Sequence, residues 1–316
     1  MNKLFRSFWF FFIGFMLSSL AVAEDLAVVA QKTNNPISDA WLLITQNDFT
    51  VLGGDGIDGT ENLNVLKFQP VLSFPMFDES WNYLFRPVVQ ITSAPLDDDL
   101  ESTDPFGDRT NGLGDLVLLN LFGPNRNDGW IWGLGPTFIV PTATEDVLGQ
   151  EKWQAGPALL AVRLGNKSGG WGLDHFNIGA LAQQWWSFGG DSDRDAVSQM
   201  DIQYFINWRR DPIRLIGMTP NIRINWKESG SDRYSIPVGL GTISLFKWGN
   251  TPVRWGVEAQ YYVTQPDPVA PEWNFRVFFA PVIGNPMKAP KITSISAEFD
   301  RYVSREPNRD VHPYWR

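Results

Sequence analysis

The stretch Met200–Trp208 reads Met-Asp-Ile-Gln-Tyr-Phe-Ile-Asn-Trp, and this pattern decides the fold class. Every second side chain from Met200 is apolar or aromatic, and Asp201, Gln203 and Asn207 share the other face. A period of two residues is that of a β-strand whose two faces meet different surroundings. The same alternation returns over 216–226 and 273–279. The sequence therefore predicts an all-β protein built from two-faced strands.

The polar faces of these strands carry Asn, Gln, Thr and isolated Arg side chains, such as Asn221, Arg223 and Arg276. In a soluble β-sandwich the polar face would meet bulk solvent and carry mixed charges. An amide-rich face with few charges is more typical of a wet barrel interior, and the apolar face then meets lipid. The alternation therefore favours a membrane barrel over a sandwich.

Composition agrees with this class. The chain has no Cys, which excludes a disulfide scaffold and a Cys-based metal site. It has 15 Trp and 22 Phe, yet its mean hydropathy is only −0.18. Beyond the N-terminal region no apolar run approaches the ~18 residues of a membrane-spanning helix. High aromatic content without long apolar runs leaves a sandwich or a strand-built membrane protein.

Residues 1–23 are predicted to be a secretory signal peptide. Lys3 and Arg6 precede an apolar run over 8–20, and the small-x-small sequence of 21–23 is typical of a cleavage site. The apolar run is too short for the ~20 residues of a spanning helix. We expect cleavage before Glu24, which removes Lys3 and Arg6 and moves the formal net charge from −9 to −11.

Loop lengths predict the architecture. Strands are predicted near 40–51, 63–73, 81–91, 112–122, 130–142, 153–164, 171–186, 198–208, 214–226, 234–246, 251–263 and 272–282. Mostly long, acidic connections cover 52–62, 92–111, 143–152, 187–197, 227–233 and 264–271. Short connections cover 74–80, 123–129, 165–170, 209–213 and 247–250. Outer-membrane barrels combine short periplasmic turns, long outside loops and an even strand number. Residues 40–282 are therefore predicted to form a transmembrane antiparallel up-and-down β-barrel of 12 strands.

Aromatic side chains are expected to form two belts at the lipid–water boundaries. The predicted periplasmic belt contains Trp41, Trp81, Trp130, Trp132, Trp171 and Trp208. The predicted outer belt contains Trp153, Trp185, Trp186, Trp226, Tyr261 and Trp273. Two stretches, 113–122 and 155–164, are apolar on both faces, so their orientation stays open.

The segments that flank the barrel have alternative interpretations. Residues 24–39 form either a plug inside the barrel or a periplasmic lead, with a short helix over 25–31 that ends before Pro36. Residues 283–316 are predicted to be a periplasmic C-terminal extension. Ile295, Ala297 and Phe299 alternate weakly, but a further strand there would break the even count.

Charged and amide side chains on the polar faces are predicted to line the lumen, because a charge facing lipid at mid-membrane costs roughly 2–4 kcal/mol. The lumen candidates are Arg86, Asp201, Gln203, Asn221, Arg223, Arg254, Glu258, Asn274 and Arg276. One hypothesis is a basic ladder that favours anions. The alternative is a structural network in which Arg254 and Arg276 pair with Glu258 and Asp201.

No catalytic, cofactor or metal site is predicted. The acidic loops contain Asp97–Asp99, Glu101, Asp104 and Asp108, and then Asp191, Asp193 and Asp195. The second group lacks the Gly and the Glu that would complete a calcium loop, so a solvated acidic rim is expected. The histidines are His175 and His312, and His175 is expected in a strand, facing the lumen with Asn177 and Gln183. A lipase-like site is not expected from these residues.

Six short motifs occur in a distinctive order: Asn35–Asp39, Gln46–Asn47, Gly112–Asp115, Pro136–Thr137, Pro141–Thr142 and Ser235–Gly241. In this order they resemble a family of bacterial outer-membrane transporters that are often labelled "neuromedin U". That family is similar to the barrels of aromatic meta-cleavage pathways. The resemblance covers about 35–282 and implies a porin-like channel, with hydrophobic or aromatic compounds as possible cargo and no established catalytic residues.

The predicted function is passive passage of small solutes, hydrophobic, aromatic or anionic, across the outer membrane of a Gram-negative bacterium. Expected partners are outer-membrane lipid, lipopolysaccharide, the assembly machinery and the solute. The acidic balance argues against nucleic acid. The alternative is a non-conducting structural or adhesive barrel; a barrel phospholipase is a weaker alternative.

Overall fold

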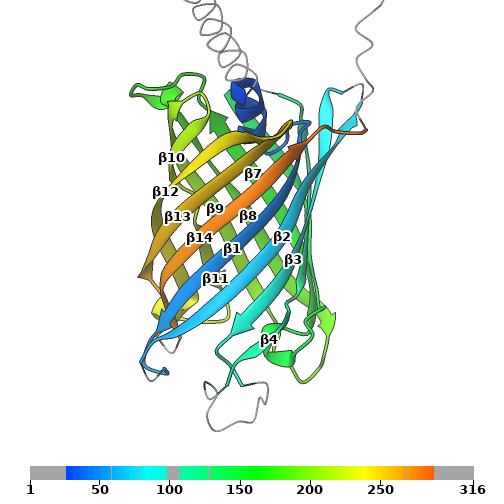
Figure 1. Cartoon of the computed structure of the whole chain (residues 1–316). Coiled ribbons are helices and arrows are strands. Elements are labelled where there is room, and N and C mark those ends of the chain that lie inside the picture. Colours follow the sequence, from blue (N-terminus) through cyan, green and yellow to red (C-terminus); the bar gives the residue numbers. More distant parts are fainter. Residues whose placement is uncertain are drawn as a thin grey trace, which may run out of the picture. The chain divides into compact units, whose positions relative to one another are not determined.

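The computed structural model describes residues 26–57, 59–77, 79–97, 106, 108–126, 129–267 and 269–287. They form one closed, tilted antiparallel barrel (Figure 1), because β1 pairs with both β2 and β14. The strands are β1 (Trp41–Gly53), β2 (Glu61–Met76), β3 (Trp81–Ala94), β4 (Thr110–Leu113), β5 (Leu116–Pro124), β6 (Gly129–Val140), β7 (Lys152–Leu164), β8 (Phe176–Gly190), β9 (Ser198–Asp211), β10 (Arg214–Met218), β11 (Asn221–Asn225), β12 (Tyr234–Trp248), β13 (Thr251–Thr264) and β14 (Ala270–Ile283). The 3₁₀ turns are η1 (Asp146–Leu148), η2 (Leu173–His175) and η3 (Gly230–Arg233), and residues 26–34 are helical.

The prediction of 12 antiparallel strands is confirmed, although two of them are interrupted. β4 and β5 both pair with β3, and the break between them holds Asp115, whose carboxylate accepts hydrogen bonds from the backbone N–H groups of Thr142, Ala143 and Gln150. β10 and β11 both pair with β9 and separate at Pro220, which has no N–H to donate. Each interrupted pair spans one barrel position.

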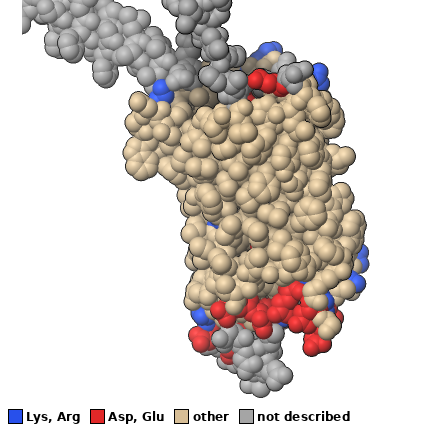
Figure 2. All heavy atoms as spheres, turned by 90° about the vertical axis from the view of Figure 1, so that its right-hand side faces the viewer, with Lys and Arg blue, Asp and Glu red and all other residues tan. Residues whose placement is uncertain are grey.

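The outer surface is apolar around its middle. Figure 2 shows a wide band with almost no charge between the two ends, and the larger group of Asp and Glu side chains at one end. Large exposed apolar side chains of the strands include Phe68, Ile91, Leu159, Leu240 and Phe275. A contiguous apolar surface of this extent is unfavourable in contact with water, so this surface belongs in lipid. The fold is that of a transmembrane β-barrel.

The assignment of Trp185 to the predicted outer aromatic belt is wrong. Trp185 is only 5% exposed and its indole N–H donates to the Thr137 hydroxyl at 3.1 Å inside the barrel. Its neighbour Trp186 is 51% exposed on the outside. Since adjacent residues of a strand face opposite sides, only one of the two could have joined the belt.

The strand predicted over 171–186 also begins later than expected. Gly172 has φ +104°, which favours glycine, and Leu173–His175 form η2 before β8 starts at Phe176. Trp171 therefore lies in the turn, 84% exposed and stacked on Trp208 at 5.9 Å between ring centroids. His175 lies in the same turn, so its predicted position in a lumen-facing strand is wrong.

The apolar core lies inside one half of the barrel, around Ile37. This side chain is fully buried among Leu84, Leu119, Leu121, Leu160 and their neighbours on β3 and β5 to β8. The inward faces of β5 and β7 are apolar here because they contact protein and not water. This explains why both faces of 113–122 and 155–164 looked apolar. None of the helices in the described ranges is long and apolar enough to cross a membrane.

Close packing between β7 and β8 predicts a glycine-specific position. A Cβ on Gly156 would lie 1.9 Å from the carbonyl oxygen of Gln184 on the paired strand β8. We expect Gly156→Ala to lower the free energy of unfolding by about 1–3 kcal/mol through overpacking. Urea unfolding of the folded barrel in lipid vesicles measures this. Gly189→Ala is the control, since nothing lies within 4 Å of a Cβ there; equal losses in both variants would contradict the packing argument.

Candidate functional site

The barrel encloses a cavity of about 840 Å³, here named the outer cavity, which opens between the long loops. Loop residues at its mouth include Gln150, Glu228 and Asp232. Of the predicted lumen residues, those that line it are Arg86, Asp201, Gln203, Asn221 and Arg223. Glutamines dominate the rest of its polar lining: Gln46, Gln69, Gln90, Gln150, Gln183 and Gln199. The cavity is therefore a polar, solvated chamber.

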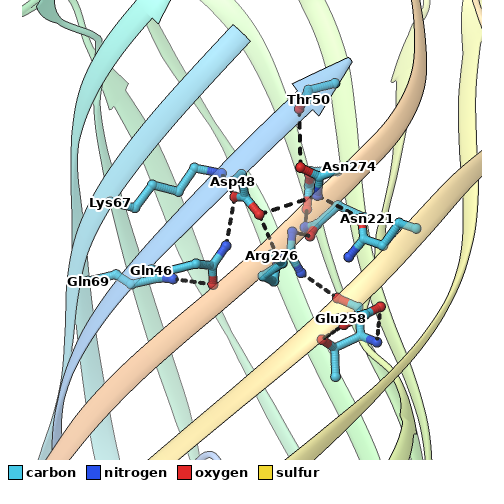
Figure 3. Close-up of polar contacts among 12 residues, drawn as sticks. Gln46, Asp48, Thr50, Lys67, Gln69, Asn221, Glu258, Asn274 and Arg276 are labelled. Carbon is cyan, nitrogen blue, oxygen red and sulfur yellow. Dashed lines mark hydrogen bonds and ion pairs between the residues drawn. The ribbon is translucent and has the colours of Figure 1, made fainter. Parts of the chain in front are cut away.

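A buried charge cluster, here named the Asp48 network, lies beside this chamber (Figure 3), and its members Gln46, Lys67 and Gln69 also line the chamber. The Asp48 carboxylate accepts hydrogen bonds from Arg276 Nε at 2.7 Å, from Lys67 Nζ at 2.9 Å and from Gln46 at 2.8 Å. Gln69 in turn donates to Gln46. Burying these charges is tolerable because both cations contact the Asp48 carboxylate, and because Asp48 and Arg276 make further hydrogen bonds.

Asn274 and Arg276 extend the network around the wall. The Asn274 amide donates to Asp48 and to Gln260, and its oxygen accepts from Thr50. Arg276 also donates to the Thr219 carbonyl at 2.7 Å and to the Asn221 amide oxygen at 3.2 Å. The predicted pairing of Arg276 with Asp201 or Glu258 is wrong: its ion pair is with Asp48, its direct partner in the β1–β14 register.

The sequence interpretation missed Asp48 and Lys67 as lumen residues. A usable signal was present, because Gln46, Asp48 and Thr50 alternate with Phe49 and Val51 along β1 in the same period-two pattern. Lys67 is opposite Gln46 in the register and so shares its inward face. The alternation of inward and outward positions along β1 and β2 would alone have placed the side chains of Asp48 and Lys67 inside the barrel.

Glu258 and Arg254 contact backbone groups and not each other. Glu258 accepts from the Thr219 N–H at 2.9 Å and from the Thr219 hydroxyl at 2.6 Å, across the glycine-rich part of β12. It thereby satisfies a backbone group in the break between β10 and β11. Arg254 donates to the carbonyl of Thr33 in the N-terminal segment. The predicted pairing of Arg254 with Glu258 or Asp201 is therefore also wrong.

Arg86 and Arg223 differ from the other lumen cations. Among the described residues neither donates a hydrogen bond or forms an ion pair within 4 Å, although Arg86 interacts electrostatically with Asp201. Asp201, opposite Arg223 in the register, accepts a hydrogen bond from Asn221 at 2.8 Å. Two cations with free donors therefore line the outer cavity.

The N-terminal segment 26–39 lies inside the other end of the barrel. Beyond Ile37, it is fixed by Asn35, which donates to the Arg126 carbonyl, and by Asn82, which donates to the Ile37 carbonyl, both at 2.6 Å. Leu26 and Ala30 of the helix pack against Leu245 of β12. These contacts join the segment to opposite parts of the wall.

The described turn before β8 holds a histidine and a carboxylate outside the lumen, and both already have partners. His175 Nδ1 accepts the Gly170 N–H at 3.1 Å within its turn. Hydrogen bonds from Arg163 hold the pKa of the neighbouring Asp174 carboxyl below its ordinary value. Within the part of the chain that the structure describes, no three His, Asp or Glu side chains group as a metal site would require. The weak alternation over 295–299, the signal segment 1–23 and most of the acidic loop 98–105 lie outside the described residues.

The comparisons agree with this geometry. The COG4313 outer membrane channel from Pseudomonas putida F1 superposes with a TM-score of 0.56 over 78% of this chain and 96% of that chain, at 12% identity. A Pseudomonas aeruginosa FadL homologue matches over 79% of this chain and 93% of that chain, with a TM-score of 0.41 and 10% identity. No protein-family model and no curated protein matches the sequence. At 12% identity the likeness shows the fold, and the chain has the barrel fold of an outer-membrane channel.

Proposed function

We propose that this protein is a channel that lets small solutes cross the outer membrane of a Gram-negative bacterium. The observation that carries the proposal is a solvated cavity of about 840 Å³ inside a barrel whose outer surface is apolar. A barrel with only a structural or adhesive role has no need for a polar chamber open to the outside. A solved structure with the same fold, from Pseudomonas putida F1, is named an outer membrane channel, which supports the proposal.

Export and surroundings follow from the same proposal. Residues 1–23 act as the signal peptide, the assembly machinery inserts the barrel, and the acidic rim faces lipopolysaccharide. Both ends of the barrel, the start of β1 and the end of β14, then lie on the periplasmic side, together with the short turns. The motif order over 35–282 supports kinship with the transporters labelled "neuromedin U", including those of aromatic meta-cleavage pathways.

We propose that residues 24–39 act as a plug. The contacts of Asn35, Ile37 and Arg254 support this, since they connect the segment with strands on different sides of the barrel. Solutes in the outer cavity then reach the periplasm only when this segment shifts or leaves.

The charge of the lumen predicts ion selectivity. Away from the loop end of the chamber, which carries Asp115, Glu228, Asp232 and Arg233, the cations Lys67, Arg86 and Arg223 outnumber Asp201, so we expect a preference for anions. The measurement is the reversal potential of a variant lacking 24–38, in planar bilayers under a potassium chloride gradient. Replacing both Arg86 and Arg223 by Gln should move the reversal potential toward zero. A cation preference in the unsubstituted variant would contradict the anion preference, and no current at all would argue for a structural barrel.

A further inference from the structure

We propose that the inner end of the outer cavity binds the carboxylate of a small organic anion, with Arg86 as its main donor and an apolar row beside it as the seat of the organic body. The inference rests on the proposed function in one respect only: it assumes that solutes enter the cavity from outside. It does not require that they pass through.

Arg86 is placed to receive a ligand. It is the innermost residue of β3 that lines the cavity, and its register partner Leu119 already belongs to the core around Ile37. Its buried Nε atom has no hydrogen-bond partner. Buried polar groups are nearly always hydrogen-bonded, so an arginine with unused donors next to a cavity is an unusual arrangement. Its planar fork of N–H groups matches a carboxylate, which accepts two parallel hydrogen bonds.

Lys67 and Arg276 already have a carboxylate partner in the Asp48 network, whereas Arg86 does not. Lys67 and Arg276 share the Asp48 carboxylate at 2.9 and 2.7 Å. Asp201 attracts Arg86 but gives no hydrogen bond to it, and its oxygen already accepts from Asn221. Arg223 adds a second positive charge to the chamber. An incoming carboxylate therefore meets a surplus of positive charge without having to break an existing ion pair.

The surface beside Arg86 is apolar and continuous. Val88 lies two residues along β3 on the same face, Val117 is its register partner on β5, and Ile139 is the partner of Val117 on β6. All three line the outer cavity, as does the edge of Trp185. An inorganic anion would contact Arg86 but leave this apolar row in contact with water. A carboxylate attached to a flat apolar body would contact both Arg86 and the apolar row. The chemistry therefore selects an organic acid over chloride or phosphate and over a neutral compound of the same shape.

The experiment is isothermal titration calorimetry of the full chain in detergent at low ionic strength, with benzoate as the probe and its dilution into empty micelles subtracted. We expect saturable binding of one benzoate per barrel, with benzamide, its neutral counterpart, and inorganic phosphate each weaker by about tenfold or more. Arg86→Gln should weaken benzoate binding by about tenfold. Arg214→Gln is the matched control, because Arg214 pairs with Asp211 at the periplasmic turn, outside the cavity; it should leave the affinity unchanged.

A second variant guards against loss of folding in Arg86→Gln. Val117→Thr is nearly isosteric and should weaken benzoate several-fold while leaving acetate, which lacks the apolar body, unaffected. Equal affinities for benzoate and benzamide, or benzoate affinity that both variants leave intact, would overturn the proposal. Equally tight phosphate would also overturn it, since the site would then be one for anions in general. Arginine-dependent benzoate binding by a barrel that never conducts would keep this inference and remove the channel function.

Discussion

Planar-bilayer recordings of a variant lacking residues 24–38 are expected to show a single-channel conductance several-fold above that of the full chain. The reason is steric, because Ile37 and the helix over 26–34 occupy the interior between opposite walls. Their removal joins the outer cavity to the periplasmic end of the barrel. The closed β1–β14 ladder does not involve this segment, so the barrel itself should persist.

Matched point variants test the same closure without a deletion. Ile37→Asp puts a carboxylate at a fully buried position in an apolar core, which costs several kcal/mol unless the segment leaves its site. It should reproduce the higher conductance. Val28→Asp changes a helix position that is 56% exposed and should behave like the unmodified chain. If all three variants and the full chain conduct alike, residues 26–39 do not close the barrel.

Replacing Asp48 by Asn is expected to destabilise the barrel by about 3–5 kcal/mol, because it leaves Lys67 and Arg276 buried without a counter-charge. An amide keeps the shape of the side chain and isolates the loss of charge. Urea unfolding in lipid vesicles, followed by tryptophan fluorescence, gives the difference in free energy. Asp174→Asn is the control, since that ion pair is exposed at the periplasmic turn and such pairs contribute little.

A triple variant tests whether the stability loss in Asp48→Asn comes from unpaired buried charge. Replacing Asp48 by Leu and both Lys67 and Arg276 by Met removes every buried charge of the cluster together, which is often neutral for stability. We expect it to recover much of what Asp48→Asn loses. A single variant as stable as the unmodified barrel, within about 0.5 kcal/mol, would mean that water reaches and screens these charges.

The fold was predictable because it follows from two local regularities. Period-two alternation assigns each strand a lipid face, and the alternation of long and short connections sets the strand count. The same parity placed Asn274, Arg276, Glu258 and Arg254 inside the barrel, in agreement with the β13–β14 register. Strand ends near tight turns were less predictable, as Trp171 and His175 show, because one glycine with positive φ determines where β8 begins.

The partners within the lumen could not be predicted. Asp48 and Arg276 are 228 residues apart in sequence and meet only because the last strand closes on the first. Likewise, Leu119 and Leu121 face inward against Ile37, so the rule that inward means polar fails where a segment of the chain fills the interior. Parity predicts which side a residue faces, but not what occupies that side.

The pairing of β1 with β14 also has a consequence for biogenesis. A chain that ends before Ala270 would contain Asp48 and Lys67 but lack Arg276, and the edge of β1 would have no neighbour there. Unpaired strand edges recruit other chains and promote aggregation. The barrel can therefore close only when β14 is available. The β1–β14 contact joins the most distant parts of the sequence and is expected to form slowest. The same contact brings Arg276 to the buried Asp48 carboxylate. An incomplete chain would expose the edge of β1 that β14 covers in the complete barrel, and it would therefore be prone to aggregate.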